Sequence, residues 1–323
     1  MGPATRVEPE IQDSLRIRRL RESVESVVRG KADAIRLACV CLIARGHLLI
    51  EDVPGVGKTT LASALAASLG CGFRRVQFTS DLMPSDIVGV AVFDPAEGSF
   101  SFRPGPLFTH VVLADEINRS SPRTQSALLE AMSEGRVSVD SQTHPLPEPF
   151  FVIATQNPLE HHGTYPLPDS QLDRFLMRIH LGYPDPAAER EIVAGFGLAR
   201  RAEDLTPVMT THELLSLQRR ALEVTLNPAL VDYIVAIIGA TRTAPSVAIG
   251  ASPRAAASLG IAARATALME GRDYVIPDDV KVLAAPVLAH RLVLRSSGSG
   301  GSGGQGGAAL VVEEILQSVE VAL

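Results

Sequence analysis

The chain has 323 residues, of which 46% are hydrophobic and 20% charged, and this composition is typical of a globular protein rather than a disordered one. Its formal net charge of −6 gives no overall field to attract a phosphate backbone, so nucleic acid is the less favoured partner. At roughly 100 to 200 residues per domain, this length predicts one large domain and one smaller domain.

The N-terminus and the cysteines indicate a cytoplasmic protein without membrane insertion. Residues 1–10 are polar and mixed in charge, and no uncharged apolar stretch reaches about 18 residues. Cys39, Cys41 and Cys71 are odd in number and lack a second Cys or His pair at metal-ligand spacing. We therefore interpret them as buried structural thiols.

The first 184 residues alternate helical and extended patterns. Two helical segments come first, at residues 10–28 and 32–44. Short apolar runs then predict five strands, at residues 47–50, 73–78, 111–114, 150–154 and 175–181. Helical patterns at 59–68 and 122–133 lie between them, so we expect a parallel sheet covered by helices on both faces.

Two hairpins interrupt this alternation. Residues 90–108 carry spaced apolar side chains on both sides of a turn-forming stretch at 94–98, which predicts an inserted hairpin. Residues 135–146 predict a second hairpin, with turn residues around Asp140 and Ser141.

After Tyr183 and Pro184 the sequence changes to Ala-rich helical segments, at residues 187–196, 212–223, 228–242, 253–269 and 277–288. We therefore predict a boundary after residue 184, with 1–184 as the core and 185–323 as a smaller helical domain. The stretch SSGSGGSGGQGG at 296–307 predicts a flexible coil, whose natural or engineered origin the sequence leaves open. Residues 310–321 predict a last helix that packs back.

A phosphate-binding loop follows the first predicted strand. Glycines let backbone N–H groups face phosphate oxygens, Lys58 can reach the β and γ phosphates of ATP, and Thr59 offers a hydroxyl to Mg²⁺. Asp52 stands where the strict pattern G-x-x-x-x-G-K-[ST] has its first glycine, and a turn that merely contains Gly-Lys-Thr is the alternative. The predicted nucleotide-binding residues are Asp52, Val53, Pro54, Gly55, Val56, Gly57, Lys58, Thr59 and Thr60.

Two carboxylates end the apolar run 111–114, and they lie at the carboxyl edge of the predicted sheet beside this loop. Asp115 is expected to hold Mg²⁺ through water together with Thr59. Glu116 is expected to orient and polarise the water that attacks the γ phosphate. A solvated strand end is the alternative. The loop and the carboxylates together predict Mg²⁺-dependent ATP hydrolysis.

Five segments resemble the motifs of MoxR-family AAA+ ATPases and occur in the family's order: EDVPGVGKT (51–59), ADEINR (114–119), ATQNP (154–158), GTYPLP (163–168) and GASPR (250–254). The resemblance implies an α/β AAA+ P-loop NTPase core followed by an all-helical lid domain, and the family's loop accepts an acidic residue at the place of Asp52. It also implies a homo-oligomer, expected to be a hexamer, that remodels a client protein in the manner of a chaperone. A client with a von Willebrand factor A domain is expected.

The same resemblance implies roles for further residues. Asn157 is the sensor that positions the attacking water, with a plain strand-cap asparagine as the alternative. Arg174, in LDRF (172–175), resembles an arginine finger for the next subunit, with Arg119 as a second candidate and a local salt bridge as the alternative. Arg254 resembles the second sensor, which contacts the γ phosphate from its own lid or from a neighbour's.

Two segments remain open after the motifs are assigned. Residues 90–108 resemble the family's helix-2 insert, and a contact of its apolar tip with substrate is one expectation, while a hairpin that packs internally is equally compatible. His161 and His162 stand where the family commonly has a glutamate, and adjacent histidines without a third ligand disfavour a zinc site.

Two other functions compete with a client-remodelling ATPase. A DNA-acting AAA+ motor also uses inserted hairpins, but the acidic balance of the chain disfavours it. A nucleotide-gated scaffold would bind ATP and hardly hydrolyse it, which the presence of Glu116, Asn157 and Arg174 disfavours.

Overall fold

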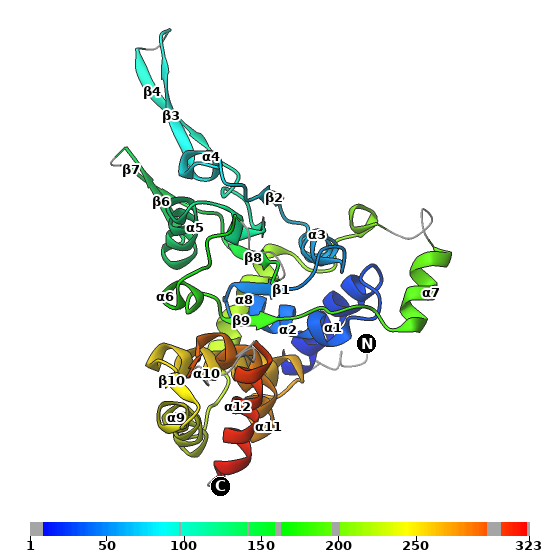
Figure 1. Ribbon diagram of the computed structural model, residues 1–323. Coiled ribbons are helices and arrows are strands. Elements are labelled where there is room, and N and C mark those ends of the chain that lie inside the picture. The colour runs from blue at the N-terminus through cyan, green and yellow to red at the C-terminus, as the bar shows by residue number, and fades with distance from the viewer. Residues whose placement is uncertain are drawn as a thin grey trace, which may run out of the picture.

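The computed structural model describes residues 9–96, 98–140, 142–158, 163–195, 201–295 and 305–321. Its centre is a five-stranded sheet of order β2-β5-β8-β1-β9, in which all neighbouring strands are parallel (Figure 1). The strands are β1 (Leu48–Glu51), β2 (Phe73–Gln77), β5 (Val111–Asp115), β8 (Phe151–Gln156) and β9 (Met177–Ile179). The five predicted strands and the parallel sheet are therefore confirmed.

Alternate residues of the central strands belong to two separate hydrophobic clusters, because successive side chains of a strand point to opposite faces. Leu48 and Ile50 lie in one cluster, whereas Leu49 lies in the other. Helices α1 (Pro9–Glu25), α2 (Ala32–Ile43) and α3 (Lys58–Ser68) contribute to the first cluster, and α5 (Pro122–Glu134) contributes to the second. Both faces are thus covered, which explains why every residue of β1 and β5 is buried.

Two antiparallel hairpins extend from the body on the side of β2 and α5 (Figure 1). The first consists of β3 (Gly89–Asp94) and β4 (Ser99–Pro104), and the second of β6 (Arg136–Val139) and β7 (Gln142–Pro145). The rings of Phe102 and His144 stack with centroids 3.9 Å apart and join the two hairpins. Further out, Phe93 and Phe100 form a pair and are 50% and 73% exposed. Both predicted hairpins are confirmed. In the first hairpin, Phe102 packs on the second hairpin, whereas Phe93 and Phe100 lie exposed.

Short elements connect the larger ones. They are α4 (Pro84–Val88), η1 (Ile117–Arg119), α6 (Asp169–Leu172), α7 (Pro186–Ala194) and η2 (Ala202–Asp204). The segment around η2 runs along the core, since η2 packs on α3 and the Val208 N–H donates to the Ser68 carbonyl. The boundary after residue 184 stays a prediction.

The C-terminal part is a helical lid with one short pair of antiparallel strands. Its elements are α8 (Thr211–Glu223), α9 (Pro228–Thr243), β10 (Val247–Ile249), α10 (Pro253–Met269), α11 (Pro277–Leu288), η3 (Ala289–Arg291), β11 (Val293–Leu294) and α12 (Gln305–Ser318). Thr210, Asn227 and Ser252 begin their helices by accepting hydrogen bonds from backbone N–H groups. Helix α10 also packs on α1 and α2, so the N-terminal helices lie between the sheet and the lid (Figure 1).

The prediction of a flexible coil at residues 296–307 is wrong for its last three residues, 305–307. Helix α12 begins at Gln305, so residues 305–307 are helical, and residues 296–304 lie outside the described part of the chain. Composition favours a coil here, but Ala308 and Val312 are buried against the lid, and this packing extends the helix toward its N-terminus.

The cysteines follow the prediction in part. Cys39 and Cys41 are fully buried in α2, and burial raises the pKa of Cys39 to about 12. Cys71 is only half-buried. Within the described residues, no three His, Cys, Asp or Glu side chains could together hold a metal ion, and no helix is long and apolar enough to cross a membrane. His161 and His162 lie outside the described residues.

Candidate active site

The loop at residues 52–57 joins β1 to α3, whose first residue is Lys58. Gly55 and Gly57 have φ angles of 87° and 98°, which side-chain-bearing residues rarely adopt. A Cβ atom at either position would meet no atom within 4 Å, so the backbone conformation rather than crowding requires glycine. Thr59 and Thr60 lie half-buried in the first turn of α3, where N–H groups without helical partners favour an anion.

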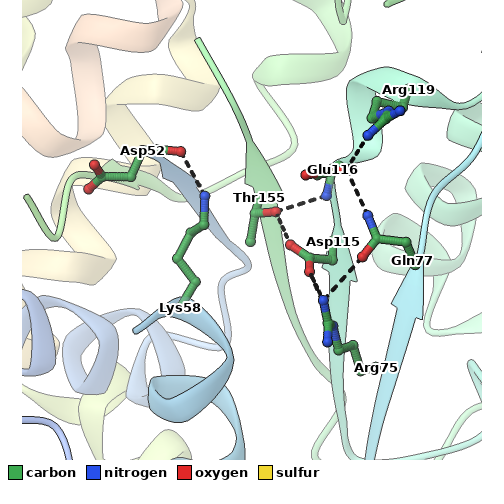
Figure 2. A network of polar contacts seen from close by, with 8 residues as sticks. All are labelled: Asp52, Lys58, Arg75, Gln77, Asp115, Glu116, Arg119 and Thr155. Atoms are coloured by element: carbon green, nitrogen blue, oxygen red, sulfur yellow. Dashed lines mark hydrogen bonds and ion pairs between the residues drawn. The ribbon is translucent and has the colours of Figure 1, made fainter. Parts of the chain in front are cut away.

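Lys58 lies against its own loop. Its Nζ donates to the Asp52 carbonyl oxygen at 2.7 Å (Figure 2). Burial lowers the pKa of Lys58, while the negative charges of Asp115, Asp52 and Glu116 oppose that shift. Lys58 therefore interacts electrostatically with Asp115, the predicted metal ligand, and with Glu116, the predicted catalytic base, but forms an ion pair with neither.

The Asp52 carboxylate points away from Lys58 and holds the loop to a distant segment. Its Oδ2 accepts from the N–H groups of Leu181 and Gly182 at 2.7 and 2.6 Å, and its Oδ1 accepts from Val53 N–H at 3.0 Å. This arrangement explains an aspartate where the strict motif has glycine, because the side chain anchors the loop to the exit of β9. The carboxylate is thus engaged with backbone groups, although it was predicted among the nucleotide-binding residues.

Asp115 and Glu116 follow each other at the carboxyl end of β5, and Thr155 of β8 fixes both. The Thr155 hydroxyl donates to Asp115 Oδ1 at 2.6 Å and accepts from Glu116 N–H at 2.8 Å (Figure 2). Glu116 has a φ angle of 58°, a left-handed conformation that is uncommon for a residue with a side chain and is often found at functional sites. The Thr155 hydroxyl therefore fixes both the Asp115 carboxylate and the backbone that carries the Glu116 side chain.

Strand β2 supplies partners for both carboxylates. Arg75 donates through Nη2 and Nε to Asp115 Oδ2, at 2.7 and 3.1 Å. Gln77 Nε2 donates to Glu116 Oε2 at 2.8 Å, and Arg119 Nη1 donates to the same oxygen at 3.0 Å (Figure 2). Arg119, a candidate for a contact with the next subunit, is thus paired within its own chain.

The remaining predicted residues lie in three places. Asn157 is buried directly after β8, at the same edge of the sheet as Asp115. Arg174 is half-buried and donates through Nη1 to the Leu129 carbonyl and the Ser133 hydroxyl of α5, at 2.7 and 2.6 Å. Arg254 is exposed in the first turn of α10. Among the described residues, Arg254 forms no hydrogen bond or ion pair with the loop or with the two carboxylates.

An open cavity of about 700 Å³ adjoins the segment that holds the Asp52 carboxylate. Its lining includes Gly30, Lys31, His180, Leu181 and Asp185. Lys31 Nζ donates to the Gly182 carbonyl at 2.8 Å and so ties the α1–α2 connection to this wall. The volume falls in the range of small-molecule sites.

Sequence reasoning missed Arg75, Gln77, Thr155 and this cavity. The available signal for Arg75, Gln77 and Thr155 was that they are polar residues near the carboxyl ends of the predicted strands 73–78 and 150–154. The pairing of β2 and β8 with β5 was needed to read it, because that pairing sets Gln77 opposite Asp115.

Comparison with known proteins decides the family. Residues 47–177 match the ATPase family associated with various cellular activities (AAA), and residues 239–306 match the AAA lid domain. Chaperone MoxR1 of Mycobacterium tuberculosis is 44% identical over 280 residues, which cover 84% of this chain and 74% of that protein. The chain belongs to the MoxR family of AAA+ ATPases.

Two other relatives of this MoxR-family ATPase extend over nearly its whole length. The Bacillus subtilis protein YeaC is 48% identical over 300 residues, which are 93% of each chain. A crystal structure of a candidate ATPase from Cytophaga hutchinsonii superposes with a TM-score of 0.88 at 35% identity and covers 97% of both chains. The predicted family and the predicted fold, an AAA+ core followed by a helical lid, are confirmed.

Proposed function

We propose that this MoxR-family ATPase binds Mg²⁺–ATP at the loop 52–60 and hydrolyses it to ADP and phosphate. The observation that carries the proposal is the position of Asp115 and Glu116, both fixed by Thr155 at the carboxyl end of β5 beside Lys58. In open α/β sheets, ligands bind at this edge. The cavity lined by Gly30 and Leu181 supports a place for the base and ribose next to the loop.

Each residue in the loop and the strand ends has a chemical role in this proposal. When ATP binds, the Lys58 ammonium gives up its hydrogen bond to the Asp52 carbonyl oxygen and donates to phosphate oxygens instead. Thr59 and Asp115 offer the hydroxyl and carboxylate oxygens that Mg²⁺ prefers, and bound magnesium would neutralise phosphate charge. Glu116 polarises the attacking water, and Asn157 helps to position it.

We further propose that ATP hydrolysis remodels a client protein within a cytoplasmic homo-oligomer, expected to be a hexamer. The chaperone name of the Mycobacterium tuberculosis relative supports a protein client, and a von Willebrand factor A domain is the partner expected from the family resemblance. The exposed pair Phe93 and Phe100 supports a contact surface on the first hairpin. Arg174, Arg119 and Arg254 are the candidates for completing a neighbour's site.

Phosphate release from Mg²⁺–ATP tests the enzymatic part of the proposal. Wild-type protein should release phosphate, and Glu116→Gln should not, while both retain the fold by circular dichroism. Absence of phosphate release from folded wild-type oligomers would reduce the proposal to nucleotide binding. Proteins that are retained by Glu116→Gln in ATP, and lost in ADP, would identify the client.

A further inference from the structure

An arginine of β2 holds the carboxylate that is proposed to help bind the metal. Arg75 approaches Asp115 Oδ2 with two N–H groups, at 2.7 and 3.1 Å, while Thr155 donates to Oδ1 at 2.6 Å. The Asp115 side chain is 11% exposed and that of Arg75 is 50% exposed. The guanidinium therefore lies between the buried carboxylate and solvent, and in the view of Figure 2 it is on the side of Asp115 away from Lys58.

The acceptor capacity of Asp115 is nearly filled by these contacts. An ionised carboxylate offers about four lone-pair sites on its two oxygens. Arg75 takes two of them and Thr155 takes a third. A magnesium ion held through water at Asp115 needs acceptor sites on this carboxylate, and its charge is repelled by the nearby guanidinium. Arg75 and a hydrated metal ion therefore compete for the same group.

The position of Arg75 follows from the sheet. Strands β2 and β5 pair in parallel with Arg75 opposite Leu113, so the long arginine side chain reaches forward along the sheet to Asp115. Arg75 Nη2 also donates to Gln77 Oε1 at 3.2 Å, and Gln77 Nε2 donates to Glu116 at 2.8 Å. The Arg75 contact thus belongs to one hydrogen-bonded chain that includes both carboxylates.

We propose that Arg75 is a built-in competitor of Mg²⁺ at Asp115 and sets the Mg²⁺ concentration that nucleotide binding requires. The inference rests on the proposed function, because it assumes that Asp115 serves the metal of Mg²⁺–ATP. Entry of the metal displaces the guanidinium from Oδ2, and the released Arg75 no longer fixes Gln77. Nucleotide entry is thereby coupled to the surroundings of Glu116.

The test measures binding rather than turnover. Binding of a fluorescently labelled ATP is followed while Mg²⁺ is raised from chelated conditions to saturation, for wild type, Arg75→Gln and Arg74→Gln. Arg74→Gln is the matched control, because it removes the same charge from the same strand. Arg74 is exposed and precedes Arg75, so its side chain points to the opposite face of the sheet. We expect Arg75→Gln to need about fivefold less Mg²⁺ for half-maximal binding, the scale of a partly exposed ion pair with two N–H donors to one carboxylate oxygen. Arg74→Gln should match wild type.

The outcomes separate this inference from the proposed function. If wild-type protein fails to bind labelled ATP at saturating Mg²⁺, the proposed function fails. If wild type binds but Arg75→Gln has an unchanged or higher Mg²⁺ requirement, the inference is overturned and the proposed function stands. Should Arg75→Gln not fold, Arg75→Lys decides, because a single ammonium replaces the two-pronged guanidinium contact. A lowered requirement in Arg75→Lys supports the inference, and an unchanged one overturns it.

Discussion

Arg291 of the lid donates through Nε to Asp173 Oδ1 at 2.6 Å, and this ion pair joins the lid to the segment before β9. The Arg291 side chain is only 3% exposed, and its Nη2 also donates to the Phe175 carbonyl at 2.8 Å. Asp173 accepts in addition from the Ser252 hydroxyl, which caps α10. The next residue, Arg174, bonds to α5. Asp173 therefore contacts the lid, and its neighbour Arg174 contacts α5, the core helix that follows Glu116 in the chain.

Removal of Asp173 should destabilise the protein strongly, because it leaves the Arg291 charge buried without its partner. We expect Asp173→Ala to lower the free energy of unfolding by about 3 kcal/mol, measured by urea denaturation. The double variant Asp173→Ala/Arg291→Met should lose less than Asp173→Ala alone. Asp169→Ala, at an exposed position four residues earlier, is the control. Equal losses in Asp173→Ala and the control would show that the ion pair is not important for stability.

Lys58 and Glu116 should separate nucleotide binding from hydrolysis. Lys58→Ala should lose affinity for ATP, because its ammonium is expected to bind phosphates. Glu116→Gln should keep that affinity and lose at least about 10²-fold in turnover, because a neutral amide cannot act as a general base. Equilibrium binding of labelled ATP and phosphate release measure the two effects. If Lys58→Ala binds ATP as tightly as wild type, Lys58 does not bind the phosphates.

Thr155 should act as a positioning residue for the two carboxylates. Thr155→Val keeps the shape but leaves Glu116 N–H without its acceptor and Asp115 Oδ1 without its donor. The Glu116 N–H is partly buried, so the loss of its acceptor should cost about 1 kcal/mol, at the lower end of the range for a buried donor. Turnover should then fall about tenfold, while ATP affinity changes less than twofold. Thr155→Ser restores the hydroxyl and should restore most of the turnover. If Thr155→Ser is as impaired as Thr155→Val, the methyl group rather than the hydroxyl matters.

Mixed oligomers test whether Arg174 completes a neighbour's site. Neither Lys58→Ala nor Arg174→Ala should hydrolyse ATP alone, because an arginine finger contributes about 10³ to 10⁵ in rate. Their mixture contains interfaces where an intact loop meets an intact arginine, so phosphate release should reappear. Subunit exchange, followed by fluorescence energy transfer, shows that mixed assemblies form. Mixtures that form and stay inactive would leave Arg174 with its bonds to α5 as a structural role and move the test to Arg119 or Arg254.

The histidine before β1 should make the stability depend on pH. His47 Nδ1 accepts from Val152 N–H, its Nε2 bonds to the Met132 carbonyl, and burial lowers its pKa from 6.5 to about 4. The folded protein therefore favours neutral His47, so this stability is fully present above pH 6.5. It is lost as the pH falls from 6.5 toward 4, by about 3 kcal/mol at the lower limit. Burial lowers the pKa of His290 as well, which acts in the same direction.

Urea unfolding between pH 7.5 and 5 measures this dependence. His47→Gln should be less stable at pH 7.5, yet its stability should fall less steeply with decreasing pH than that of wild type. The exposed His212 gives the control His212→Gln, which should keep the wild-type slope. An unchanged slope in His47→Gln would assign the pH dependence to other groups.

The sequence by itself determined those parts of the site that are contiguous in the chain. Phosphate binding uses neighbouring backbone N–H groups and the start of one helix, so its residues lie within one short segment, Gly55 to Thr59. The apolar run that ends in Asp115 and Glu116 places both carboxylates at the end of a strand without knowledge of its neighbours. The alternation of apolar runs and helical patterns likewise sufficed for the parallel sheet.

Only the tertiary structure decided the partners of these residues, because parallel strands join segments that are far apart in sequence. Arg75 contacts Asp115 across 40 residues, and the Asp52 carboxylate binds Leu181 N–H across 129 residues. Residues 305–307 show the same limit, since local composition predicts a coil and the burial of Ala308 decides for a helix. A local pattern specifies the chemistry that a segment can offer, but long-range packing free energy determines which groups meet.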